Sequence, residues 1–146
     1  MASKSNALET AYLNLLFKNT DFATVGDATG LRGSTTAGSL YIGLYTADPG
    51  ETGDQTTTEV AYTGYARVAV TRGAGFTVTG NSVALAADVT FPASSSAGST
   101  AGYWGIGTAA SPGAGVLLYS AAISPTIACT SGVTPKLTAG ALAIED

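Results

Sequence analysis

The sequence contains no histidine and only one cysteine, Cys129. Without histidine, serine and cysteine nucleophiles lack their usual imidazole base, and the commonest zinc ligand is missing. One cysteine excludes an intrachain disulfide and a thiolate metal cluster. It lies in the strand-like stretch 126–129, where a buried, inert thiol is expected. We therefore predict no catalytic residues, no metal, no cofactor, no small-molecule substrate and no enzymatic activity.

Charged side chains are also scarce. Asp, Glu, Lys and Arg make up 11% of the 146 residues, against about 25% in a typical soluble domain. The net charge is −4, whereas nucleic-acid binding requires a basic patch that displaces counterions. We therefore expect no nucleic-acid partner. A surface with few charges loses little when a partner covers it, which favours a component of an assembly.

Long hydrophobic runs are absent as well. No apolar stretch approaches the roughly 18 residues of a membrane-spanning helix. Glu9 and Asn14 interrupt the apolar core that a secretory signal peptide would need. The sequence predicts no membrane contact, and we expect the protein to be made and folded in a cytoplasm.

One helix is predicted, over residues 6–18. Asn6 and Glu9 have the spacing of a capping box, and Lys18 suits the last turn. An apolar stripe of four residues recurs at helical spacing, namely Leu8, Ala11, Tyr12 and Leu15. This stripe either closes an open end of a β-sandwich or contacts a neighbouring subunit.

Nearly everything after residue 38 has the character of short strands separated by turns. In the first of them Leu40, Ile42 and Leu44 alternate with Tyr41, Gly43 and Tyr45, the period of two that a half-buried strand requires. Gly80 and Asn81 indicate a tight hairpin. The predicted strands are 39–46, 58–71, 75–79, 82–86, 88–91, 101–108, 115–122, 126–129 and 141–145.

This spacing predicts one domain over residues 1–146, with a helix at 6–18 and a β-sandwich at 39–146. The expected fold class is all-β, an antiparallel β-sandwich or jelly roll with one short N-terminal α-helix. The loop 48–54 carries Asp48, Glu51 and Asp54. It is either a solvated turn around Asp48-Pro49-Gly50 or a calcium site, because Ca²⁺ prefers oxygen ligands on a flexible loop.

Residues 62–67 form the other candidate contact region. Arg67 lies among apolar strand residues, where an arginine is either paired with a carboxylate or points outward on a solvated face. Tyr62 and Tyr65 flank Gly64 and are either core residues or interface residues. The residues predicted to contact a partner are Leu8, Tyr12, Leu15, Tyr62, Tyr65 and Arg67.

Six segments of the sequence together resemble a family of small tailed-phage virion proteins, closest to the capsid cement (decoration) protein of Bordetella-type short-tailed phages. The segments that carry the resemblance are 40–49, 59–68, 89–93, 103–107, 115–119 and 137–144. The resemblance implies a jelly roll that forms a homodimer and binds the outer surface of the major capsid protein lattice. It also implies a location in the virion after synthesis in the cytoplasm of a bacterial host.

Two other functions fit the same residues. One is a phage tail or tail-fibre component, which needs the same rigid, unreactive scaffold. The other is a small carbohydrate-binding β-sandwich module, which would require exposed aromatic side chains that converge on one patch. Trp104, flanked by Gly102 and Gly105, is expected to be a packing residue rather than part of such a patch.

Overall fold

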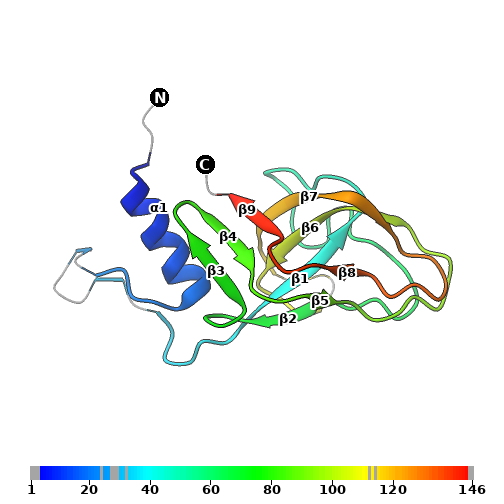
Figure 1. Cartoon of the computed structure of the whole chain (residues 1–146), viewed down its shortest axis with the longest axis horizontal. Helices are drawn as coiled ribbons and strands as arrows, with labels where there is room; N and C mark the ends of the chain where they lie inside the picture. Colours follow the sequence, from blue (N-terminus) through cyan, green and yellow to red (C-terminus); the bar gives the residue numbers. More distant parts are fainter. Residues whose placement is uncertain are drawn as a thin grey trace. The chain divides into compact units, whose positions relative to one another are not determined.

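The computed structural model describes residues 4–23, 25–26, 30–31, 33–111, 113 and 115–144 (Figure 1). The chain is mostly β-structure with antiparallel pairing and one short N-terminal helix, which confirms the predicted all-β sandwich class. The helical part is α1 (Asn6–Leu13), which continues as a π-helical turn, η1 (Asn14–Lys18). The strands are β1 (Ser39–Tyr45), β2 (Val68–Thr71), β3 (Phe76–Thr79), β4 (Ser82–Leu85), β5 (Val89–Thr90), β6 (Thr100–Gly107), β7 (Leu117–Ala128), β8 (Lys136–Leu137) and β9 (Leu142–Ile144).

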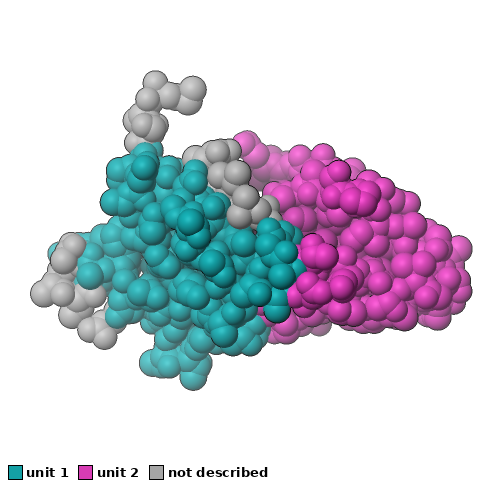
Figure 2. Space-filling model, viewed as in Figure 1, with its two compact units in different colours: residues 1–39, 71–87, 139–146 teal, residues 40–70, 88–138 magenta. Residues whose placement is uncertain are grey.

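The chain divides into two compact units (Figure 2). The first comprises Met1–Ser39, Thr71–Ala87 and Ala139–Asp146, and the second comprises Leu40–Val70 and Asp88–Thr138. The first contains the helix and a sheet of strand order β3-β4-β9. The second contains nearly all of a four-stranded sheet of order β2-β1-β6-β7 and the two-stranded sheet β5-β8.

In the first unit, the helix lies beside the β3–β4 hairpin (Figure 1). Its N-cap is Ser5, whose hydroxyl accepts from the backbone N–H of Leu8, and not Asn6 as the sequence predicted. With Ser5 as the cap the helix begins at Asn6, which agrees with the predicted range 6–18. The buried side chains are Leu13 and Phe17, and the Phe17 ring packs against Phe76 at 5.2 Å between centroids.

The β3–β4 hairpin confirms the predicted turn at Gly80 and Asn81. Thr79 pairs with Ser82, and Gly80 adopts a φ of 59°, a conformation that glycine accepts without a Cβ clash.

In the second unit, β1 and β6 form the interior of the sheet and supply most of its core. Leu40, Ile42 and Leu44 are buried, as the alternation predicted. Tyr45, on the other face, is also buried, because the loop that follows β1 covers that end of the strand. Trp104 of β6 is 3% exposed, which confirms the packing role predicted for it.

Three of the predicted strands, namely 58–71, 115–122 and 126–129, differ from the structure. The predicted strand 58–71 is regular only from Val68 to Thr71. Gly64, with a φ of 98°, turns the chain, and the Tyr65 N–H donates to the Tyr62 carbonyl across that turn.

The predicted strands 115–122 and 126–129 form the single strand β7. The register moves from Tyr103–Ala122 to Ala101–Ile127, so residues 123–126 form a bulge opposite Gly102. Pro125 lies in this bulge, where the missing N–H costs no ladder bond.

Candidate functional site

The second unit contains a buried ionic cluster around the candidate residue Arg67. Its side chain is 0% exposed. Nε donates to Glu59 Oε1 at 2.7 Å and NH2 donates to Glu59 Oε2 at 2.8 Å, a bidentate ion pair. NH1 donates to the carbonyls of Ala109 (3.1 Å) and Ser111 (2.7 Å), and NH2 also donates to the Gln55 carbonyl (2.8 Å). All five guanidinium donors are used, which confirms the paired alternative for Arg67.

Glu59 connects this cluster to β1. The Tyr65 hydroxyl donates to Glu59 Oε1 at 2.9 Å and accepts from the Leu44 backbone N–H at 3.0 Å. The hydrogen bond to Glu59 raises the pKa of Arg67, so its charge is fixed. Burial raises the pKa of Tyr65 well above its ordinary value. Both groups therefore hold their protons at neutral pH and are suited to anchoring rather than to proton transfer.

Gln55 is the second buried polar side chain of the cluster, at 0% exposed. Its Nε2 donates to the Ala109 carbonyl at 3.3 Å, and its Oε1 accepts from the Ala109 N–H at 2.9 Å. The sequence did not predict this residue. Gly107 and Gly115 leave the space that it fills, because a Cβ at either position would overlap the Gln55 side chain. The hydrogen bonds of Arg67 and Gln55 therefore connect the loop after β1 to the loop after β6.

Tyr45 lies next to this cluster. Among the described residues, its hydroxyl is the buried side-chain polar atom without a hydrogen-bond partner. Burial raises its pKa far above the ordinary value, and the neighbouring Glu59 acts in the same direction. Tyr45 packs against Gly43 and Gly105, since a Cβ at either glycine would crowd its ring or hydroxyl.

Tyr62, another predicted contact residue, is 8% exposed and donates to the Pro92 carbonyl at 2.9 Å. Its ring meets that of Tyr65 edge-on at 5.3 Å, and Tyr65 stacks on Phe91 at 6.4 Å. A shallow hollow lies over this part of the unit. It is lined by residues 59–63, Tyr65, Ser96 and Ala97. The tyrosines and Arg67 therefore lie together and contribute mainly to the interior, and their contact with a partner stays a prediction.

Leu8 and Tyr12 occupy the outer face of α1, with 41% and 44% of their surfaces exposed. Leu15 is half-buried. Because an α-helix turns about 100° per residue, the buried Leu13 lies about 100° from Tyr12 and about 140° from Leu8 around the helix axis. Because Leu8 and Tyr12 are exposed, the interpretation that they close the sandwich is wrong. The other alternative, contact with a neighbouring subunit, stays a prediction.

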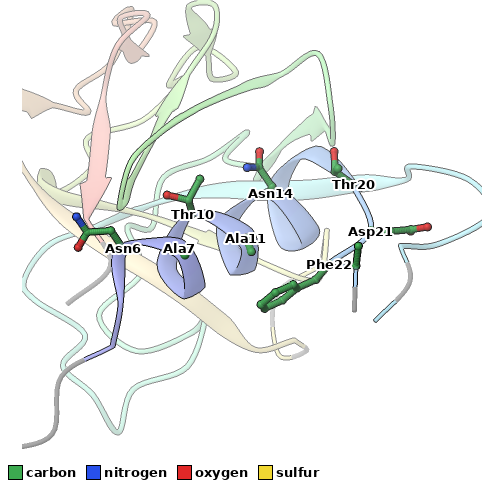
Figure 3. Close-up of a pocket in the computed structure, with 9 residues that line it drawn as sticks. Asn6, Ala7, Thr10, Ala11, Asn14, Thr20, Asp21 and Phe22 are labelled. Carbon is green, nitrogen blue, oxygen red and sulfur yellow. The ribbon is translucent and has the colours of Figure 1, made fainter. Parts of the chain in front are cut away.

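A second hollow lies on the first unit (Figure 3). Its lining combines one side of the helix with residues 20–23, and includes Ala7, Ala11 and the Phe22 ring. The carboxylate of Asp21 accepts from the Gly33 N–H at 2.8 Å. Alanine, asparagine and threonine supply most of the remaining lining. The hollow is therefore suited to packing and hydrogen-bonding contacts rather than to proton transfer.

The acidic loop has the hydrogen bonds of a turn. Asp54 Oδ1 accepts from the backbone N–H and the hydroxyl of both Thr56 and Thr57. These bonds hold the pKa of Asp54 below its ordinary value. Asp48 Oδ1 accepts from the Gly50 N–H. No group of acidic or cysteine side chains that could hold a metal ion occurs in the described ranges, which favours the turn over the calcium site.

Cys129 is 0% exposed, as predicted. Burial raises the pKa of its thiol and keeps it protonated and unreactive. Within the part of the chain that the structure describes, no helix has the length and apolar character needed to span a membrane.

The fold and the buried cluster define the class: a β-sandwich protein in which a buried arginine bonds to a carboxylate and to the carbonyls of two loops. Residues 3–145 match the family model described as podophage GP4 fiber I protein gp80. The chain therefore belongs to this family and is a structural protein of a phage virion. A search of curated proteins returned no match.

Proposed function

We propose that this protein is a structural building block of a podophage fibre. The observation that carries the proposal is the family match, which spans residues 3–145 and thus nearly the whole chain. The family description names a fibre protein, so the match supports the tail-fibre alternative better than the capsid cement that the resemblance implied.

The physical character of the chain suits this role. A fibre subunit must keep its shape while it is held by neighbours, and it needs no reactive group. The Arg67 cluster uses its charges for internal bonds. The surface carries few charges, so contact with other virion proteins requires little desolvation. Capsid cement is the second candidate, since a lattice protein would share these properties and would bind the major capsid protein.

The location within the particle distinguishes the two candidates. Purified phage can be labelled with gold-conjugated antibody against this chain and imaged by electron microscopy. We expect label on the fibres at the tail end of the particle. Label spread evenly over the head would overturn the fibre proposal in favour of cement. Absence from intact particles would contradict both.

A further inference from the structure

We draw no further inference here: the strongest candidate, the exposed apolar face that Leu8 and Tyr12 form on the helix α1, carries none, because nothing in the described part of the structure shows what covers it.

Discussion

Arg67 and Glu59 form a bidentate ion pair inside the second unit, with an Nε–Oε1 distance of 2.7 Å and side chains that are 0% and 10% exposed. Lys136 and Asp88 form an ion pair of nearly the same length, 2.8 Å, but their side chains are 48% and 47% exposed. The two pairs should differ greatly in their effect on stability. Removing one partner of a buried pair leaves an uncompensated charge, whereas an exposed charge is solvated by water.

The first prediction uses this contrast. Arg67→Ala removes the cationic partner of the Glu59 carboxylate and one donor from each of three loop carbonyls, and should lower the free energy of unfolding by about 3–5 kcal/mol. Lys136→Ala is the matched control, for which the loss should stay below about 1 kcal/mol. Urea unfolding followed by tryptophan fluorescence measures both. Similar losses for the two variants would show that burial does not set the strength of the Arg67 pair.

The sequence predicted that Arg67 is either paired or exposed but did not identify its partner. The reason is geometric. On the predicted strand 58–71, Glu59 and Arg67 would lie about 26 Å apart, at roughly 3.3 Å per residue. The turn at Gly64 instead brings them together, because a φ of 98° is open to glycine. The turn at Gly64 thus makes possible the Arg67–Glu59 ion pair, which a continuous strand would exclude.

A second prediction concerns Gly107. A Cβ at this position would overlap the buried Gln55 side chain, so Gly107→Ala should displace Gln55 from Ala109. We expect a loss of about 1–3 kcal/mol, typical of overpacking. Gly102→Ala, in the same strand, is the control. Its nearest neighbour would be the Thr46 carbonyl at an ordinary 3.5 Å, so its unfolding midpoint should not fall. Equal behaviour of the two variants would contradict the packing role of Gly107.

The helix shows a different limit of sequence reasoning. Its extent, residues 6–18, is predicted correctly, because capping and periodicity are local properties. The face that packs is not predicted. Both sides of the helix carry apolar residues, with Leu8 and Tyr12 on one and Leu13 and Phe17 on the other. Which side is buried depends on distant residues such as Phe76, and helical spacing alone contains no information about them.

A third prediction concerns the end of the helix. The Arg72 guanidinium donates to the carbonyls of Leu15 (2.6 Å) and Leu16 (2.7 Å), and the Gly73 N–H donates to the Phe17 carbonyl. These carbonyls lie in the last turn, where a helix provides no partner of its own. Arg72→Ala should destabilise this turn by on the order of 2 kcal/mol, since bonds to charged donors are stronger than neutral ones.

Hydrogen exchange locates that effect. In Arg72→Ala, amides of residues 14–20 should exchange faster, while those of β1 and β6 should keep their protection. Lys136→Ala again provides a control with no expected change near the helix. Uniformly faster exchange throughout the chain would indicate global destabilisation and contradict a local role for Arg72.

The last prediction concerns alkaline pH. Burial raises the pKa of Tyr62 from 10.0 to about 12, and raises the pKa of Tyr45 and Tyr65 further. The folded state thus keeps protons that the unfolded state releases above pH 10. The resulting stability is fully present below the unfolded pKa and is lost as pH rises through the folded pKa. We expect the urea midpoint to fall steadily between pH 10 and 12, together with the appearance of tyrosinate absorbance.

Tyr62→Phe should reduce this dependence of the midpoint on pH. At neutral pH the variant should lose about 1 kcal/mol of stability, because its hydrogen bond to the Pro92 carbonyl is gone. A midpoint that stays constant across this range would show that the tyrosines ionise in the folded protein, and that burial does not hold their protons.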